Sequence, residues 1–211
     1  MVKVKPFEKY TSEYEDWFRK NHFVYISELR AVKSLLPVTR KGVEIGVGSG
    51  RFASRLGISL GLDPSIKMLK LARRNGIRVI SAIAEELPFE NDRFDFVLMV
   101  TTICFLDDIQ SAFREVHRIL RRRGHFIIGF VDRESSLGKI YEQNREKSEF
   151  YKVANFYSVD EIISYLRQIG FRHFDFRQTI FRSLNDIRGI EPVESGFGRG
   201  SFVVIRAENR A

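Results

Sequence analysis

Hydrophobic residues recur along the chain with two periods, one typical of helices and one typical of strands. The clearest helical pattern lies in residues 109–120, where apolar positions fall at i, i+3, i+4, i+7, i+10 and i+11 and share one face. Asp107 or Asp108 is placed to cap the start of this helix, and Gly124 to end it. Apolar runs at 94–100 and 125–131 flank the helix, so we expect a strand on each side.

The same patterns predict the remaining elements. Capping-box spacing marks the helix starts at Ser12 with Glu15 and at Ser158 with Glu161, and Pro64 stands at the first position of a helix that Gly76 ends. The predicted helices are 12–36 (with a break near Asn21), 51–57, 64–76, 109–120 and 158–170. The predicted strands are 42–47, 59–63, 77–84, 94–100, 125–131, 173–181 and 201–207.

Strands that alternate with helices indicate right-handed crossovers and a parallel sheet covered on both faces. We therefore predict an α/β, Rossmann-like, doubly wound sheet of seven strands, mostly parallel, whose last two strands form an antiparallel edge pair. The expected organisation is one domain: a helical cap at 1–37, a Rossmann-like region at 38–211 and a lid insertion at about 132–157. In such sheets ligands bind beyond the carboxyl ends of the strands.

Composition narrows the class of protein. The chain has 211 residues, of which 44% are hydrophobic and 13% aromatic, enough for a substantial core. The single Cys104 excludes an intrachain disulfide and a multi-cysteine zinc site, and we expect no metal. No apolar run approaches the roughly 20 residues of a membrane helix, and the N-terminus lacks an apolar signal core, so we expect a cytoplasmic protein.

The net charge of +8 favours an acidic partner such as nucleic acid, but the basic residues are dispersed. The one dense run, Arg118 with Arg121 to Arg123, is interpreted as the cationic end of the helix that begins near residue 109. Nucleic acid is therefore a less favoured partner, though not an excluded one.

The stretch "KGVEIGVGSGRF", residues 41–52, contains the most informative chemistry. A dinucleotide fingerprint beginning at Gly46 needs its third glycine at position 51, which is Arg51. The spacing is instead E-x-G-x-G-x-G, with Gly48 and Gly50. Glu44 at the strand end repels a pyrophosphate and attracts an ammonium group. The turn therefore favours a ligand without phosphates.

The next strands extend this interpretation. Asp63 ends the second strand, where an acidic residue can accept both hydroxyls of a ribose. The third strand leads into "AIAEELPF", where a backbone amide and a side chain can contact the edge of a base. A ligand with an ammonium group, a ribose and a base but no phosphate is S-adenosylmethionine.

At this point the chain resembles the class I S-adenosylmethionine-dependent methyltransferases, especially the small single-domain ones. "VEIGVGSG", "LGLDPS" and "AEELPF" are similar to the first three motifs of that family, and "FDFVLMVTTICFLDD" and "RILRRRGHFIIG" to its later ones. The resemblance covers roughly residues 38–130 by motif and the remainder by element order. One position departs from the family: Ile83 stands where an aspartate often accepts from the adenine amino group.

The resemblance implies roles for twelve residues. Backbone at the first glycines would pass close to the methionine part of the cofactor, and a carboxylate at the strand end would help hold its amino group. Residues after the second and third strands would bind the ribose and adenine, and residues after the fourth would lie near the sulfonium. The implied cofactor-binding residues are Glu44, Gly46, Gly48, Gly50, Asp63, Pro64, Met68, Ala84, Glu85, Thr101, Thr102 and Phe105.

The acceptor is less defined, because methyl transfer needs mainly in-line placement and exclusion of water. In this family acceptor sites lie under the N-terminal segment and the insertion after the fifth strand. Both are rich in aromatic residues here, namely Tyr10, Tyr14, Trp17 and Phe18 in the first and Tyr141, Phe150, Tyr151, Phe156 and Tyr157 in the second. The catalytic candidates are Tyr10, Tyr14 and His22.

The leading hypothesis is a methyltransferase that acts on a small-molecule acceptor. An enzyme that methylates RNA or protein is supported only by the net charge, and no N/D-P-P-Y/F stretch typical of base amino-methylation follows the fourth strand. A binding module that holds a nucleoside-type ligand without catalysis is the third hypothesis. A nicotinamide-dependent dehydrogenase is disfavoured by Arg51.

Overall fold

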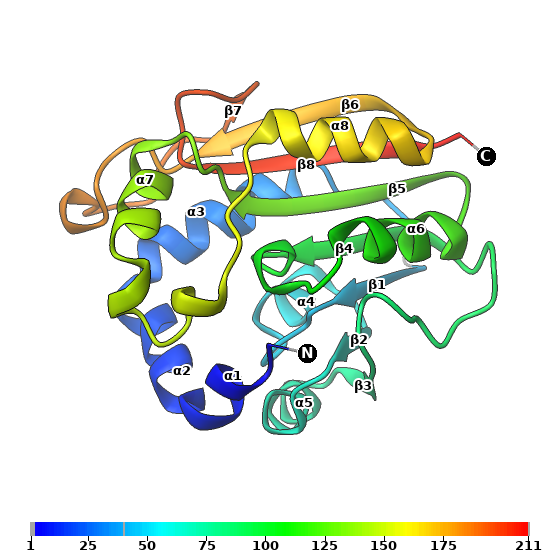
Figure 1. The fold of residues 1–211 in the computed structure, drawn as a ribbon, viewed down its shortest axis with the longest axis horizontal. Coiled ribbons are helices and arrows are strands. Elements are labelled where there is room, and N and C mark those ends of the chain that lie inside the picture. Colours follow the sequence, from blue (N-terminus) through cyan, green and yellow to red (C-terminus); the bar gives the residue numbers. More distant parts are fainter. Residues whose placement is uncertain (1–2, 40, 211) are drawn as a thin grey trace.

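The structure, a computed structural model, describes residues 3–39 and 41–210. Within them eight strands form one sheet in the order β3-β2-β1-β4-β5-β8-β6-β7 (Figure 1). The strands are β1 Gly42–Ile45, β2 Leu60–Asp63, β3 Arg78–Ser81, β4 Phe94–Val100, β5 Leu120–Val131, β6 Phe171–Thr179, β7 Glu194–Ser195 and β8 Phe202–Asn209.

The first five strands are parallel, and β8 runs antiparallel to both β5 and β6. The predicted Rossmann-like fold and its antiparallel pair are therefore confirmed. The sheet has one strand more than the seven predicted, and the additional strand is β7. It contains only two residues, which pair with the outer side of β6, and so short a segment has no hydrophobic period to detect.

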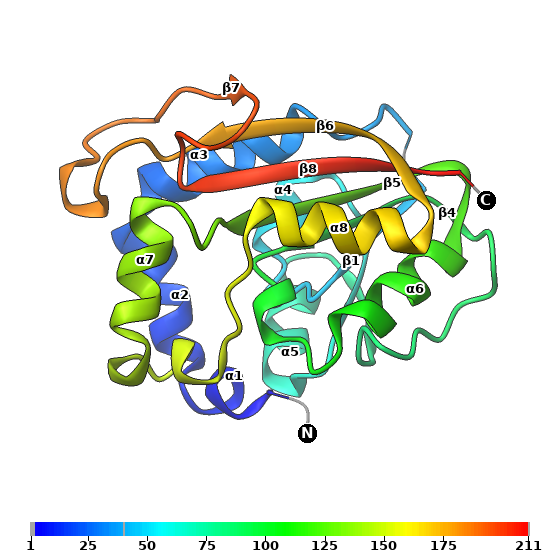
Figure 2. The ribbon, with the colours of Figure 1, turned by 45° about the horizontal axis from the view of Figure 1, so that its top comes forward.

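Helices cover both faces of the sheet. Buried residues of α6 and α8 share one core cluster with β4, β5 and β8, and buried residues of α2 to α5 share a second cluster on the opposite face (Figures 1 and 2). The helices are α1 Lys5–Lys9, α2 Thr11–Lys20, α3 His22–Lys33, α4 Arg51–Leu56, α5 Ile66–Arg74, α6 Ile109–Ile119, α7 Ser136–Gln143 and α8 Val159–Ile169. Short 3-10 turns are η1 Ile103–Phe105, η2 Arg145–Lys147, η3 Tyr151–Val153 and η4 Leu184–Asp186.

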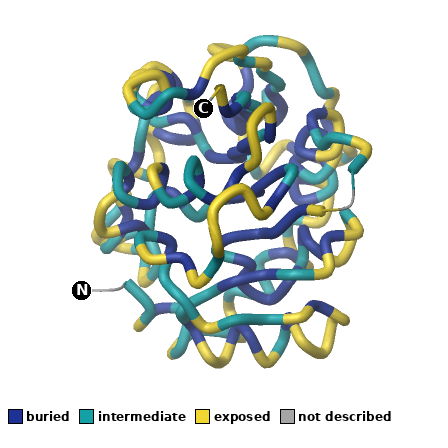
Figure 3. The backbone as a smooth tube through the Cα atoms, turned by 90° about the vertical axis from the view of Figure 1, so that its right-hand side faces the viewer, coloured by how far each residue is buried: buried dark blue, intermediate teal, exposed yellow. Residues whose placement is uncertain are grey.

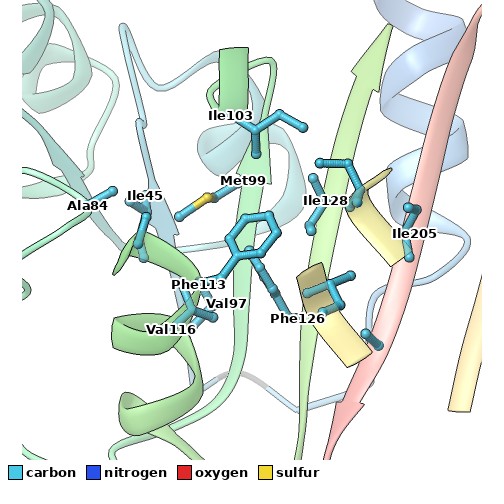
Figure 4. Packing of buried hydrophobic residues seen from close by; sticks show 14 of the residues in the cluster. Ile45, Ala84, Val97, Met99, Ile103, Phe113, Val116, Phe126, Ile128 and Ile205 are labelled. Carbon is cyan, nitrogen blue, oxygen red and sulfur yellow. The ribbon is translucent and has the colours of Figure 1, made fainter. Parts of the chain in front are cut away.

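Alternation along the central strands assigns their side chains to the two clusters. In β4, Val97 and Met99 pack toward α6, while Leu98 points to the other face. The ring of Phe113 in α6 packs near Val97 of β4 and Phe126 of β5, and the rings of Phe113 and Phe126 are both fully buried (Figure 4). The tube coloured by burial shows buried segments running through the centre and exposed ones on the outer turns (Figure 3). The sheet is thus the rigid base of the molecule.

The end of α6 differs from the prediction. The helix ends at Ile119 and the chain enters β5 directly at Leu120, so Gly124 lies inside the strand and does not end the helix. The amides of residues 92 and 93 donate to the carbonyls of residues 118 and 119, so these carbonyls are satisfied without a further helical turn before Gly124. The interpretation of Arg121 to Arg123 as a helix end is therefore wrong.

The N-terminal helices also differ in detail. The break at Asn21 is confirmed, but Ser12 is not a cap, because α2 follows α1 with only Tyr10 between them. The Tyr14 amide already donates to the Tyr10 carbonyl, so Ser12 lies within the first turn. Farther along the chain the next helix begins at Ile66 and not at Pro64, and Ser65 caps it, since the Ser65 hydroxyl accepts from the Met68 amide of α5.

Two caps agree with the sequence. Asp108 accepts from the amides of Gln110 and Ser111 at the start of α6. The capping box of Ser158 with Glu161 is present at the start of α8. Both helices therefore begin where local side-chain chemistry predicts.

The N-terminal helices and α7 lie at the carboxyl ends of β4 and β5 (Figure 1). Glu8 of α1 accepts from the Ser65 hydroxyl at 2.7 Å and from the Lys67 amide at 3.1 Å. Glu15 of α2 accepts from the Arg51 guanidinium at 3.1 Å. These contacts hold the N-terminal segment against the starts of α4 and α5.

No helix in the described part of the chain has the length and apolar character needed to cross a bilayer.

Candidate functional site

The glycine turn after β1 is tied to the end of β2 by one carboxylate. Asp63 accepts from the Gly48 amide at 2.9 Å with one oxygen and from the Ser65 amide at 2.8 Å with the other. Gly46 lies so close to Thr102 that an added Cβ would be 2.3 Å from its side chain. Only glycine allows β1 and the end of β4 to approach this closely.

Behind this turn lies a second carboxylate, Glu44, with 2% of its surface exposed. Among the described residues, one of its oxygens has no hydrogen-bond partner, while the Ala53 amide contacts the carboxylate. Burial raises the pKa of Glu44 well above its usual range, and nearby Asp63 raises it further. A buried acid with one unpartnered oxygen, close to a glycine turn, is suited to a cationic group in a bound ligand.

A groove runs along the ends of β1, β2 and β4 and the loop after β3. It is lined by backbone and small side chains on the sheet side, and by α1 and α2 on the other side. The lining residues are Lys3, Val4, Phe7, Tyr14, Ile45, Gly46, Gly48, Asp63, Pro64, Ser65, Ala82, Ile83, Ala84, Glu85, Val100, Thr101, Thr102, Phe105, Leu106 and Asp107.

Next to the groove is a larger cavity of about 310 Å³, which we call the aromatic chamber. Twelve of its twenty lining residues are aromatic, and none is lysine or arginine. They are Phe7, Glu13, Tyr14, Trp17, Phe18, Glu28, Phe52, Thr101, Ile103, Cys104, Phe105, Phe130, Val131, Tyr141, Ser148, Phe150, Tyr151, Phe156, Tyr157 and Leu184. The groove and the chamber share Phe7, Tyr14, Thr101 and Phe105, so these four residues form the boundary between them.

The chamber contains an unusual acid. Glu28 of α3 is 5% exposed and lines the chamber, and burial alone raises the pKa of its carboxyl to about 8. Across residues 3–39 and 41–210, neither a hydrogen bond nor an ion pair to this carboxyl is present. Cys104 in the same wall remains a thiol, because burial raises its pKa to about 12.

The comparisons with known proteins agree on one family. A family model described as a methyltransferase domain matches residues 43–128. An uncharacterised protein of Methanocaldococcus jannaschii is 45% identical over 202 residues, which span 96% of this chain and 98% of that protein. A crystal structure from Thermotoga maritima, described as an S-adenosylmethionine-dependent methyltransferase and "possible histamine N-methyltransferase", is 50% identical, covers 98% of this chain and 100% of that one, and has a TM-score of 0.96.

This chain belongs to the class I S-adenosylmethionine-dependent methyltransferases. A ubiquinone/menaquinone biosynthesis C-methyltransferase of Rickettsia bellii is a more distant relative, 27% identical over 172 residues that span 64% of this chain and 69% of that protein. The family resemblance of the motifs is therefore confirmed, and with it the dependence on S-adenosylmethionine.

The methyltransferase brings nine of the twelve implied cofactor residues together in the groove. They are Gly46, Gly48, Asp63, Pro64, Ala84, Glu85, Thr101, Thr102 and Phe105. The other three lie elsewhere: Glu44 sits behind the glycine turn, Gly50 packs against Ala72 of α5, and Met68 is fully buried in the core. Glu85 accepts from the amides of Asp107 and Asp108, so its carboxylate is fixed at the start of α6.

The three catalytic candidates differ in whether they line the two cavities. Tyr14 lines both the groove and the chamber, with its hydroxyl over Gly48. Tyr10 lines neither and packs against Phe150, with ring centroids 6.2 Å apart. His22 is exposed at the start of α3, outside both linings. Of the nine aromatic residues singled out in the sequence, all except Tyr10 line the chamber.

Several lining residues of the methyltransferase escaped the sequence analysis. Phe7 lies in the short α1 and Lys3 lies just before it, and this segment has too few residues to show a helical period. Glu28 had a detectable signal: it falls on a buried face with Val24, Ala31 and Val32 at i−4, i+3 and i+4. A lone acid on an apolar helix face is a candidate for a functional group.

The buried acid of α3 predicts a dependence of the methyltransferase's stability on pH. The pKa of Glu28 rises from 4.5 in the unfolded chain to about 8 in the folded protein. Its contribution to stability is therefore fully present below about 4.5 and is lost as the pH rises through about 8. The Glu28→Gln variant lacks this loss. Its melting temperature, relative to that of the wild type, should therefore be higher at pH 9 than at pH 5.

Calorimetric melting of both cofactor-free proteins at the two pH values measures this gain. We expect at least about 2 °C, the shift that about 1 kcal/mol causes in a chain of this length. An equal difference between variant and wild type at both pH values would show that Glu28 does not titrate in the folded protein in this range.

Proposed function

We propose that this methyltransferase transfers a methyl group to a small-molecule acceptor held in the aromatic chamber. The observation that carries the proposal is the boundary between the two cavities, where Phe7, Tyr14, Thr101 and Phe105 belong to both linings. An acceptor in the chamber then faces the groove across these residues. A volume of about 310 Å³ suits a small molecule and is at the lower end for ligand pockets.

We assign the groove to the cofactor. The bound cofactor supplies an electrophilic methyl group on a sulfonium. Asp63 has one further lone pair on each carboxylate oxygen for the ribose hydroxyls, beyond the amides that it already accepts from. The unpartnered oxygen of Glu44 suits the ammonium of the methionine part, and Gly46 and Gly48 allow close approach of backbone. Glu44, Gly50 and Met68 would act from outside the groove lining, by charge or by packing.

The chain's own part in the reaction is placement and exclusion of water. Thr101 follows β4 directly and its amide donates to the Gly129 carbonyl of β5, while Phe105 lies in η1 shortly after it, so this part of the boundary is held at the end of the sheet. Aromatic walls favour a dry chamber and attract developing positive charge. Tyr14 is the catalytic candidate best placed to contact an acceptor, because it lines both cavities.

We further propose that residues 1–37 act as a cap and that residues 132–157 act as a lid insertion. The contacts of Glu8 with Ser65 and of Glu15 with Arg51 support this, since they hold the N-terminal helices beside the groove. Both segments supply aromatic walls to the chamber. Their opening would admit the acceptor and release the product.

The alternative acceptors are RNA and protein. The chamber lining contains no lysine or arginine, which disfavours a phosphate backbone in it despite the net charge of +8. The Thermotoga maritima relative is described as a possible histamine N-methyltransferase, and histamine is a small molecule of the kind that the chamber can take.

Asp63 is tested by the Asp63→Asn variant. Loss of charge-assisted hydrogen bonds to the ribose should weaken the binding of S-adenosylhomocysteine by about 1.5–3 kcal/mol, measured by calorimetry. Burial raises the pKa of Asp63 to about 6, and hydroxyl donors favour the ionised form, so wild-type affinity should fall as the pH drops below about 6. The variant should lack this part of the pH dependence. Unchanged affinity with a lower melting temperature would leave Asp63 as a structural cap.

The acceptor class is tested by measuring the release of S-adenosylhomocysteine with a panel of small amines (histamine included), phenols and thiols, and with transfer RNA. We expect release with a small molecule. The Cys104→Phe variant fills part of the chamber and should lose this activity while keeping its affinity for S-adenosylhomocysteine. Activity with transfer RNA alone, with a complex that survives about 200 mM salt, would contradict the proposal.

A further inference from the structure

Glu28 differs from every other charged group in the two cavities. Glu13, the second carboxylate of the chamber, is exposed. Asp63 accepts from two amides, and Glu85 also accepts from two. Glu28 is 5% exposed and, in the part of the chain that the structure describes, its carboxyl has neither a hydrogen bond nor a cation beside it.

A buried acid without partners lowers the stability of a fold. Buried carboxylates that serve structure are paired with a cation or accept from amides, because desolvation is otherwise uncompensated. Glu191, which packs near α3, is an example in this chain: it is 4% exposed, accepts from the Phe181 amide at 2.8 Å and lies 3.4 Å from the Arg182 guanidinium. Glu28 has no such arrangement within residues 3–39 and 41–210, so a bound ligand is a candidate for the missing partner.

The surroundings of Glu28 are suited to a positive charge. Tyr141 of α7 and Tyr151 of η3 line the same chamber; burial is the main cause that raises the pKa of each, and the nearby charge of Glu28 adds a smaller part. Twelve aromatic residues line the chamber, and aromatic faces attract cations. The combination of a single buried carboxylate with aromatic walls and no basic residue is complementary to an ammonium group and repels a carboxylate or phosphate.

We propose that Glu28 binds a positively charged group of the acceptor, so that the methyltransferase selects cationic amines. This inference rests on the proposed function, since it assigns the chamber to the acceptor. A protonated or quaternary nitrogen has no lone pair with which to attack the methyl group. The group that Glu28 binds is therefore distinct from the accepting atom, which faces the boundary at Thr101 and Phe105, and Glu28 is a specificity-determining residue.

The test compares ligands that have the same shape and differ in charge. One pair is choline and 3,3-dimethylbutan-1-ol, and the other is phenethylamine and 2-phenylethanol. Each is titrated into the protein saturated with S-adenosylhomocysteine at pH 9, above the pKa of about 8 of Glu28, so that its carboxyl is ionised before the ligand binds. Trp17 is the only tryptophan in the chain and lines the chamber, so quenching of its fluorescence reports binding there. In at least one pair, we expect the wild type to bind the cation at least about tenfold more tightly than its neutral partner.

The Glu28→Gln variant keeps the shape of the side chain and removes its charge. The preference for the cation should fall to about threefold or less, while the affinities for the neutral alcohols and for S-adenosylhomocysteine stay the same. Affinity for S-adenosylhomocysteine also verifies that the variant is folded. The matched control is Glu142→Gln, which removes the same charge from an exposed position on α7 beside Tyr141 and should keep the full preference.

The wild-type titrations alone can overturn the proposal. Equal binding of cation and neutral partner in both pairs, or no binding of either cation, would overturn it. A cation preference that survives in Glu28→Gln would assign the selectivity to the aromatic walls instead. If the wild type meanwhile methylates a neutral small molecule, the proposed function stands and only the role of Glu28 falls. Methylation of transfer RNA alone would remove both.

Discussion

The position of the groove depends on the carboxylate of Asp63. Its two oxygens accept from amides on either side, one in the glycine turn after β1 and one at the start of α5. The pairing of β1 with β2 places the two strand ends side by side, and this single side chain then joins the turn after β1 to the segment that leads into α5. The same carboxylate keeps lone pairs free toward the groove, so the group that shapes the turn is also available to a ligand.

The second cavity follows from what covers this edge of the sheet. Helices α1 and α2 are held by Glu8 and Glu15 to the starts of α5 and α4, and α7 with η3 completes the wall. Arg51, which breaks the dinucleotide glycine pattern, is the partner of Glu15. Arg51, whose position disfavours a dinucleotide ligand, thus also holds α2 in place through Glu15. The result is a mainly aromatic space that adjoins the groove at four residues.

Much of this arrangement can be predicted from the sequence, because its signals are local. The period of α6, the capping box at Ser158 and the glycine spacing after β1 each depend on a few neighbouring residues. The errors arise where a distant segment decides the outcome. The loop at residues 92–93 ends α6 before Gly124, and α1 moves the helix start away from Ser12.

The residues of the candidate site also divide into those that local sequence patterns predict and those that depend on distant contacts. Nine implied residues reach the groove because their motifs follow strand ends, whose positions the sheet dictates. Gly50 and Met68 belong to the same motifs but face α5 and the core, a difference that depends on packing and not on spacing. Glu28 is detectable as a lone acid on an apolar helix face, but its place in a chamber depends on Tyr141 and Tyr151, which lie more than 100 positions later.

The central claim is that the cofactor's sulfur faces the aromatic chamber across the boundary formed by Phe7, Tyr14, Thr101 and Phe105. A crystal structure of the protein with S-adenosylhomocysteine tests this most directly. The account predicts density for the ribose at Asp63 and for the sulfur beside Thr101 and Phe105, open toward the chamber. A sulfur that faces bulk solvent, or that is separated from the chamber by a closed wall, would contradict it.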